Sequence, residues 1–372
     1  MTRIILLDVD GVLVQPGGYR AALRATLNYF IEPRLDLQEE TLTNLEKRGI
    51  TSEWDMSPLL LASYWTDILS RQPMQNLPSD VAAAAVEINR QRKVDAPARM
   101  SVPEFSLVAG QYPAEAAFHA GCFALLPYGL QKNLLTETRN IHKSYTMRIF
   151  QHFTLGSKRF AETYKLPAEF ETKPFLLTYD KSNINEEIRS KLCQPDHHLA
   201  ALTVRPSAPP REVFDSHSGY APEAELALEL VGLSDIPAIA FGKLEYLASH
   251  YGLETATLMK PSPFHALAGV LAAWTGEEWP SLQAANHWRE TGSLNGLLDQ
   301  LPRAFELMVV EDTMGGIQST RSAGEILKKA GLDVHVFAIG LTSGSSEKAS
   351  AFEQAGVQYF QDWDSLIKGQ IG

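Results

Sequence analysis

The sequence predicts an α/β protein, with a Rossmann-like three-layer core around a parallel sheet and an inserted, mainly α-helical cap domain. The apolar run at residues 4–7, Ile-Ile-Leu-Leu, is typical of a strand buried on both faces of a parallel sheet. Strand and helix patterns alternate after residue 175, whereas the stretch before it shows mainly helical patterning. We therefore expect a core from residues 1–14 and 175–372 and a helical cap from residues 15–174.

Length, composition and charge limit the classes of protein to consider. The 372 residues, 45% hydrophobic and 21% charged, are enough for one large or two medium globular domains. A net charge of −11 argues against a general nucleic-acid or anionic-membrane binder. No apolar run reaches the length of a membrane span, and residues 4–7 are too short for a signal peptide. Cys122 and Cys193 lack metal-binding spacing and suit a reducing compartment, so we expect a cytoplasmic protein. We expect it to be a monomer or a homodimer.

Helical spacing dominates the expected cap. A turn signal, Gln-Pro-Gly-Gly, is followed by Leu23, Leu27 and Phe30 at the spacing of one helix face. Residues 51–55 read as a polar loop that carries an aromatic side chain. We expect helices at residues 19–30, 57–69, 78–92, 113–123, 136–150 and 157–164.

Strands and helices alternate in the expected core. Apolar runs bounded by turn residues predict strands at 174–179, 199–204, 236–241, 255–259, 307–310, 334–339 and 357–360. Amphipathic patterns predict helices at 185–192, from 222, from 263, after 316 and at 346–355. Short connections and right-handed crossovers would arrange these strands in one parallel sheet between two helical layers.

Two carboxylates, Asp8 and Asp10, follow the first expected strand, and Gly11 permits a sharp turn after them. Ligands of open parallel sheets bind at the carboxyl ends of the strands. There Asp8 could attack phosphorus and form an aspartyl phosphate, and Asp10 could act as general acid and then as base. Two acids so close together also favour Mg²⁺, which prefers oxygen ligands. An acidic strand end can also have no catalytic role. The hypothesis therefore depends on whether the ends of the other expected strands carry polar groups as well.

Three further expected strand ends also carry polar groups: Thr203, Lys260, and Glu311 with Asp312. In this order they resemble the motifs of the haloacid dehalogenase (HAD) superfamily of aspartyl-phosphate enzymes. The segment Asp-Val-Asp-Gly-Val-Leu, which begins at Asp8, is close to that family's D-x-D-G-[VT]-L. Glu-Asp-Thr-x-x-Gly, which begins at Glu311, is similar to its E-D-[ST]-x-x-G.

The resemblance covers the expected core. The insertion between the first and second motifs resembles the helical C1 cap of subfamily I, which includes phosphoglycolate phosphatase and β-phosphoglucomutase. The resemblance implies that Asp8 is the nucleophile and Asp10 the acid/base. It implies that the Thr203 hydroxyl binds the transferring phosphoryl group and that the Lys260 ammonium offsets charge on the nucleophile and the phosphoryl oxygens.

The metal ligands are also implied by the resemblance. Asp8, Glu311 and Asp312 would hold Mg²⁺ together with Asp10, the last through its backbone carbonyl. Glu311 could instead support Asp312 without touching the metal. Arg205 is a candidate for substrate binding beside Thr203 and Lys260, although an exposed loop arginine would fit the pattern equally well.

Two of the motif residues have simpler explanations. Thr203 could be an ordinary strand residue, in which case Thr178 is the rival for the second motif. Lys260 could be a solvated lysine before a helix. In the cap, the candidates for substrate contact are Arg20, Trp54, Asp55 and a basic set that could share one helix face or be solvated, namely Arg139, His142, Lys143 and Arg148. His197 and His198 read as loop histidines.

An acid two residues after the nucleophile disfavours the dehalogenase and phosphonatase branches of the superfamily, and the lack of membrane helices disfavours P-type ATPases. We therefore expect a Mg²⁺-dependent phosphohydrolase that cleaves a small phosphomonoester through an aspartyl-phosphate intermediate. The alternative is a sugar-phosphate phosphomutase, in which the phosphoryl group passes to a second hydroxyl. A non-catalytic HAD-like binding module is a third hypothesis, against which the complete set of acids argues.

Overall fold

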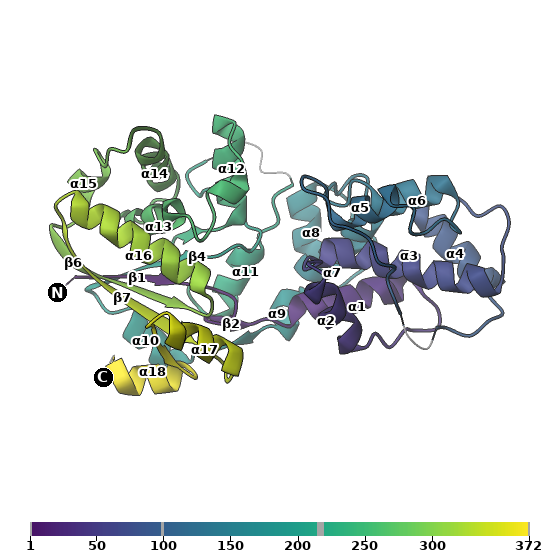
Figure 1. Ribbon diagram of the computed structural model, residues 1–372, viewed down its shortest axis with the longest axis horizontal. Coiled ribbons are helices and arrows are strands. Elements are labelled where there is room, and N and C mark those ends of the chain that lie inside the picture. Colours follow the sequence, from purple (N-terminus) through teal and green to yellow (C-terminus); the bar gives the residue numbers. More distant parts are fainter. Residues whose placement is uncertain (1, 98–99, 214–218, 371–372) are drawn as a thin grey trace. The chain divides into compact units, whose positions relative to one another are not determined.

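The computed structural model describes residues 2–97, 100–213 and 219–370, and these residues form two compact units (Figure 1). Unit 1 contains the chain up to Pro16 and from Asp180 onward, and unit 2 contains Gly17–Tyr179. Unit 2 is thus an insertion in the sequence of unit 1. Unit 2 begins at Gly17, inside the expected cap of residues 15–174, and ends at Tyr179, beyond it. The reason is that β2 (Val14–Gln15) pairs with β3 (Lys181–Ser182) in unit 1.

Unit 1 is built on a parallel sheet that, in the described part of the chain, has six strands in the order β5-β4-β1-β6-β7-β8. Numbered along the chain, this is the strand order 3-2-1-4-5-6 of a Rossmann-like doubly wound sheet. The α/β fold class expected from the sequence is therefore confirmed. The strands are β1 (Arg3–Leu7), β4 (His197–Leu202), β5 (Ala238–Ile239), β6 (Ala304–Glu311), β7 (Asp333–Leu341) and β8 (Gln358–Phe360).

Helices cover both faces of this sheet. Ile4 and Leu6 of β1 pack against one helical layer, and Ile5 and Leu7 pack against the other, because side chains alternate along a strand. In Figure 1, α13 (Pro263–Thr275) and α16 (Met314–Lys329) lie on one side of the sheet, and α10 (Glu186–Leu192) and α18 (Trp363–Gln370) lie on the other. Full burial of each such side chain stabilises the fold by about 1.5–3 kcal/mol, which explains the uninterrupted apolar run.

The first layer consists of α12 (Phe241–Tyr251), α13 (Pro263–Thr275) and α16 (Met314–Lys329). The second consists of α10 (Glu186–Leu192), α11 (Glu223–Leu230) and α18 (Trp363–Gln370). Unit 1 also contains η1 (Thr255–Thr257), α14 (Trp279–Thr291), α15 (Leu297–Gln300) and α17 (Ser346–Gln354).

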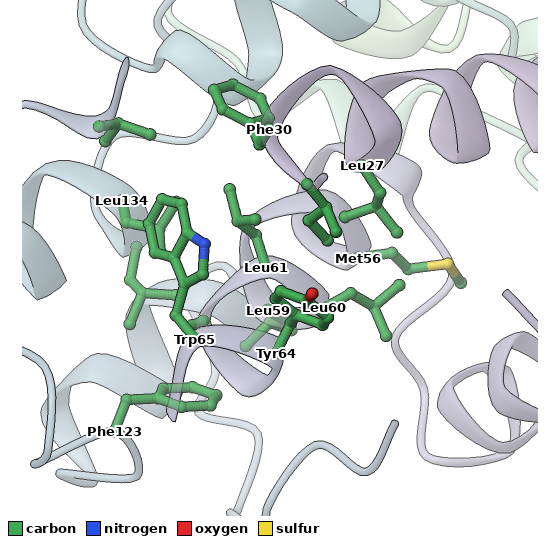
Figure 2. Close-up of a cluster of buried hydrophobic side chains, with 14 of the residues drawn as sticks. Leu27, Phe30, Met56, Leu59, Leu60, Leu61, Tyr64, Trp65, Phe123 and Leu134 are labelled. Atoms are coloured by element: carbon green, nitrogen blue, oxygen red, sulfur yellow. The ribbon is translucent and has the colours of Figure 1, made fainter. Parts of the chain in front are cut away.

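Unit 2 is helical, and its core surrounds α3 (Glu53–Arg71). Residues on every side of α3 are buried, including Tyr64 and Trp65, as expected for a helix at the centre of a bundle. Figure 2 shows Phe30 of α1, Leu134 of α6 and the Trp65 ring within this cluster. The helices are α1 (Gly18–Phe30), α2 (Glu39–Lys47), α3 (Glu53–Arg71), α4 (Val81–Gln91), α5 (Pro113–His119), α6 (Tyr128–Leu135), α7 (Tyr145–Leu155), α8 (Ser157–Tyr164) and α9 (Phe175–Tyr179).

Three expected strands are wrong or shorter than predicted. Residues 174–179 contain helix α9, and residues 255–259 contain the 3-10 turn η1. The strand expected at 236–241 is reduced to β5, because α12 begins at Phe241. Short apolar runs suit a strand or a buried helical turn equally well, and only the available pairing partner decides between them.

Two further predictions in unit 2 are wrong. The loop expected at 51–55 contains the start of α3, where the Ser52 hydroxyl caps the helix by accepting the Trp54 N–H at 3.3 Å. The helix expected at 136–150 begins only at Tyr145, where the Ser144 hydroxyl accepts the Met147 N–H at 3.2 Å. Serine at each position supplies a strong helix-start signal that the apolar spacing alone did not reveal.

No helix in the described ranges combines the length and the apolar character required to cross a membrane.

Candidate active site

The strand order reverses between β1 and β6, which lie side by side. The chain reaches β6 only after passing through β4 and β5 toward the opposite edge, and ligands of doubly wound sheets bind at such a reversal. The register pairs Leu7 with Val310, and the Asp8 N–H donates to the Val310 carbonyl at 3.0 Å. Asp8 therefore lies level with Glu311, and carboxylates from two strands converge at this point.

A buried lysine joins these two carboxylates. Lys260 Nζ lies 2.7 Å from Asp8 Oδ1 and 2.5 Å from Glu311 Oε1. All three side chains are at most 9% exposed, so the solvated-lysine alternative is wrong. Glu311 also accepts a hydrogen bond from the Thr313 hydroxyl, at 3.1 Å. Lys260 and Asp8 are 252 residues apart in the sequence, and only the folded chain brings them together.

One ammonium group does not neutralise two buried carboxylates. Burial, and next the negative charge of Glu311, raise the pKa of Asp8 well above its usual range, although Lys260 acts in the opposite direction. Burial alone would lower the pKa of Lys260, but the charges of Asp8 and Glu311 outweigh it and raise that pKa. Lys260 therefore stays cationic, and the raised pKa of Asp8 indicates a site that favours additional positive charge, from a proton or from a bound cation.

The residues at this point fit a divalent cation. Carboxylate oxygens of Asp8, Glu311 and Asp312 lie within 4.8 Å of one another. Lys348 Nζ, on α17, lies 2.5 Å from Asp312 Oδ2. Counted as ions, three carboxylates and the two ammonium groups of Lys260 and Lys348 leave one net negative charge. Hard oxygen donors with excess negative charge are the set that Mg²⁺ prefers, and Asp8, Glu311 and Asp312 would hold it.

Two glycines allow the acids to sit so close to the backbone. Gly11 has φ +77°, and a Cβ at this position would overlap the Asp312 carboxylate. A Cβ at Gly316, in the first turn of α16, would overlap the Glu311 carboxylate. The glycines that follow the two acidic motifs are therefore required by space at both positions and by backbone conformation at Gly11.

Asp10 points to a different partner. Its carboxylate accepts hydrogen bonds from Arg205 Nε, at 3.0 and 2.8 Å, and from Arg205 Nη2, at 2.6 Å. Arg205 Nη2 also donates to Asp180 Oδ2 at 2.9 Å. Arg205 is only 2% exposed, so its reading as an exposed loop arginine is wrong. The acidic cluster thus receives side chains from Asp8, Glu311 and Asp312, while the side chain of Asp10 is held by Arg205.

Thr203 lies directly after β4 and is buried. Its N–H donates to the Ile239 carbonyl at 3.1 Å, and its hydroxyl accepts the Arg205 N–H, also at 3.1 Å. The rival Thr178 lies in α9, where its hydroxyl donates to the Pro174 carbonyl at 2.8 Å. Thr203, unlike Thr178, therefore lies at the end of a sheet strand.

A histidine that the sequence analysis missed supports Lys260. His265 is fully buried in the first turn of α13, with Nδ1 3.2 Å from the Lys260 backbone nitrogen and Nε2 2.8 Å from the Ile239 carbonyl oxygen. Burial, and next the charge of Lys260, lower the pKa of His265 to about 3. The ring is therefore neutral, and this geometry assigns its proton to Nε2.

Asp180 and Lys348 were also missed. The first lies between an apolar helix and a short strand, and the second lies on a polar helix surface, so neither is part of a recognisable motif. The only sequence signal for His265 is its place in the apolar helix that follows Lys260.

The cap candidates are engaged inside unit 2. Arg139 Nη2 lies 2.5 Å from the buried Asp55 Oδ2, and its guanidinium lies over the rings of Trp54 and Tyr112, at 4.8 and 4.6 Å from their centroids. Arg20 forms ion pairs with Glu39 and Glu46. These contacts give the charged groups a structural role in unit 2.

The alternative in which the four basic residues of the cap share one helix face is wrong. Arg139, His142 and Lys143 precede α7, whereas Arg148 lies on it. Lys143 pairs with Glu137 at 2.7 Å, and Arg148 lies 3.7 Å from Glu169. The histidines expected in a loop, His197 and His198, belong instead to β4, with the His198 ring 4.4 Å from that of Trp274.

No family model matches this chain, and no curated protein matches it. A similar solved structure is the X-ray structure of Northeast Structural Genomics Consortium target ZR25, with a TM-score of 0.66 and 14% sequence identity. The alignment covers 99% of this chain and 98% of that chain. At this identity the likeness concerns the fold alone, and it supports the α/β architecture described above.

Proposed function

We propose that this chain is a Mg²⁺-dependent HAD-like phosphohydrolase that cleaves a small phosphomonoester through an aspartyl phosphate on Asp8. The observation that carries the proposal is the meeting of Asp8, Lys260, Glu311 and Asp312 at the strand-order reversal. The resemblance of the four motifs to those of the HAD superfamily supports the same reaction class. The comparisons with known proteins carry no functional information for this choice.

The first half-reaction would use Asp8 as the nucleophile. Asp8 Oδ1 is bonded to Lys260, which leaves Oδ2 to attack phosphorus. The new Oδ2–P bond forms as the bond from phosphorus to the ester oxygen breaks, and Asp10 gives its proton to the leaving oxygen. Lys260 offsets the negative charge that gathers on the phosphoryl oxygens, and the Thr203 hydroxyl orients the group.

The second half-reaction would reverse the proton flow. Asp10, now ionised, takes a proton from water as the water oxygen attacks phosphorus. The bond between phosphorus and Asp8 breaks, which releases inorganic phosphate and restores both carboxyl groups to their starting forms. When bound, Mg²⁺ would be held by Asp8, Glu311 and Asp312 and would supply additional positive charge at the transferring phosphoryl group.

The decisive experiment is a phosphate-release screen over sugar phosphates, nucleotides and phosphoglycolate, with Mg²⁺ and with EDTA. We expect release that requires Mg²⁺ and is lost in Asp8→Asn while circular dichroism shows a folded protein. Asp333→Asn is the matched control, because that carboxylate is 70% exposed at the first residue of β7, and this variant should retain wild-type activity. Full activity in Asp8→Asn would exclude the aspartyl-phosphate mechanism.

The same screen separates the alternatives. Conversion of one sugar phosphate into its isomer, without phosphate release, would make the protein a phosphomutase that uses the same Asp8 chemistry. A lack of turnover on every substrate with Mg²⁺ present would favour a non-catalytic binding module.

A further inference from the structure

Lys260 is not held by the sheet ladder. It follows the 3-10 turn η1 and precedes α13, so its backbone lies in a connecting segment. Its ammonium group must nevertheless meet two buried carboxylates, at the end of a flexible side chain with high rotamer entropy. The Lys260 backbone N–H donates to His265 Nδ1, at 3.2 Å. The place of this segment is therefore set partly by an imidazole ring.

The ring connects this segment to the sheet. His265 Nε2–H donates to the Ile239 carbonyl at 2.8 Å, and the same carbonyl accepts the Thr203 N–H at 3.1 Å. Ile239 ends β5, and Thr203 follows β4. One buried side chain thus ties the lysine segment to the ends of two neighbouring strands. A neutral imidazole suits this position because it offers one acceptor and one donor to two buried backbone groups.

We propose that His265 is a positioning residue, which acts through the Lys260 backbone to hold the ammonium group of Lys260 against Asp8 and Glu311. For turnover, this inference rests on the proposed phosphohydrolase function; for the placement of Lys260, it stands independently. A shift of about 1 Å in a charged group can cost about 100-fold in rate. Loss of the hydrogen bonds of His265 should therefore lower kcat more than it weakens substrate binding.

Three substitutions separate the two hydrogen bonds of the ring. His265→Asn places an amide oxygen near the position of Nδ1 and keeps the acceptor for the Lys260 N–H. His265→Gln places an amide nitrogen near the position of Nε2 and keeps the donor to Ile239 but not the acceptor. His265→Leu removes both. His250→Asn is the control, because His250 is exposed near the end of α12.

Two measurements are needed for each variant. The first is the pair kcat and KM on the best substrate of the phosphate-release screen. The second is the rate at which an amine-reactive acylating reagent modifies Lys260, followed by mass spectrometry of the peptide. The second measurement does not depend on turnover, because it reports only how well the ammonium group is held by its carboxylates.

We expect Gln and Leu at position 265 to lower kcat by about 10- to 100-fold, to leave KM within about threefold and to speed Lys260 acylation about tenfold. Asparagine should restore both quantities to within about threefold of the wild type. If all three variants are folded and behave alike, or if Lys260 acylation is unchanged in Gln and Leu, the positioning role is excluded.

Failure of the proposed function is distinguishable from failure of this inference. If the wild type releases no phosphate from any substrate, the acylation series still supports or excludes the positioning role. If His265→Leu does not fold, the comparison of Asn with Gln decides, because both are polar side chains that retain one of the two hydrogen bonds.

Discussion

Arg205 holds Asp10 by two nitrogens of its guanidinium, with N–O distances between 2.6 and 3.0 Å. The Asp10 side chain is 36% exposed, whereas Asp180, which contacts the same guanidinium, is 0% exposed. The planar donor fork of arginine suits such two-sided binding better than a lysine ammonium does. The carboxylate proposed as acid and base is therefore oriented by a buried cation that it shares with a second aspartate.

Removal of Arg205 should reduce both stability and turnover. Arg205→Met takes this cation from the buried Asp180 carboxylate, and breaking such a pair typically costs about 3–5 kcal/mol in the free energy of unfolding. Urea denaturation measures this loss. The double variant Arg205→Met/Asp180→Leu should regain much of the stability, because it leaves no fully buried carboxylate without its cation and the Asp10 side chain is 36% exposed to water. It should not regain turnover, because Asp10 still lacks the arginine that orients it. Wild-type stability of Arg205→Met alone would contradict the buried pair.

Mg²⁺ should raise the midpoint of thermal unfolding, because an ion that binds only the folded state stabilises it. Isothermal titration calorimetry should show that Asp312→Asn binds Mg²⁺ at least about tenfold more weakly than the wild type, because it loses one of the three carboxylates.

Lys348→Met should bind Mg²⁺ more tightly than the wild type in the same calorimetric titration, because the variant lacks the ammonium group that competes for Asp312. Lys158→Met is the control, with a side chain 88% exposed in unit 2. Weaker binding in Lys348→Met would show that Lys348 assists the site.

The buried His265 should make the protein sensitive to acid. Its pKa is about 3 in the folded state, below the usual value of about 6.5, so the unfolded state binds the proton first as pH falls. The contribution of His265 to the free energy of unfolding is fully present above pH ~6.5. It is lost as the pH falls toward the pKa of the folded state, by up to about 1.4 kcal/mol per pH unit.

Urea denaturation at several pH values between about 7 and 4 tests this sign. His265→Asn should remove this part of the slope of the unfolding free energy against pH, while His250→Asn should retain it. An unchanged slope in His265→Asn would mean that the ring is not held neutral in the folded protein.

Lys243, on α12, forms another buried charge cluster in unit 1. Its Nζ lies 2.9 Å from Glu225 and 3.1 Å from Glu278. Burial acts to lower the pKa of Lys243, but the two carboxylates raise it overall, so its contribution to stability persists at neutral pH and is lost above pH ~10.4. Lys243→Met should lower the free energy of unfolding by about 3–5 kcal/mol at neutral pH. Lys158→Met, a surface control, should change it by less than about 0.5 kcal/mol.

The sequence by itself determined the fold class and the position of the acids. A strand buried on both faces must be apolar throughout, so residues 4–7 identify the sheet centre, and the charged residues must follow where the strand ends. Parallel strands have their carboxyl ends at the same edge, which brings Asp8 and Glu311 together once the strand order is known. Local patterns were sufficient for the strands and for the acids at their ends, because these features depend on neighbours along the chain. The pairing of β1 with β6 is a tertiary feature.

Only the tertiary structure decided which charged and polar groups meet. The pairs Arg205–Asp180, His265–Lys260 and Lys348–Asp312 join separate elements, and no periodicity along the chain records them. The same limit explains the wrong strands at 174–179 and 255–259, because a short apolar run becomes a strand only where a free edge can pair with its backbone. Local patterning reports which face of an element is buried, whereas hydrogen bonds and ion pairs depend on what the completed fold places opposite it.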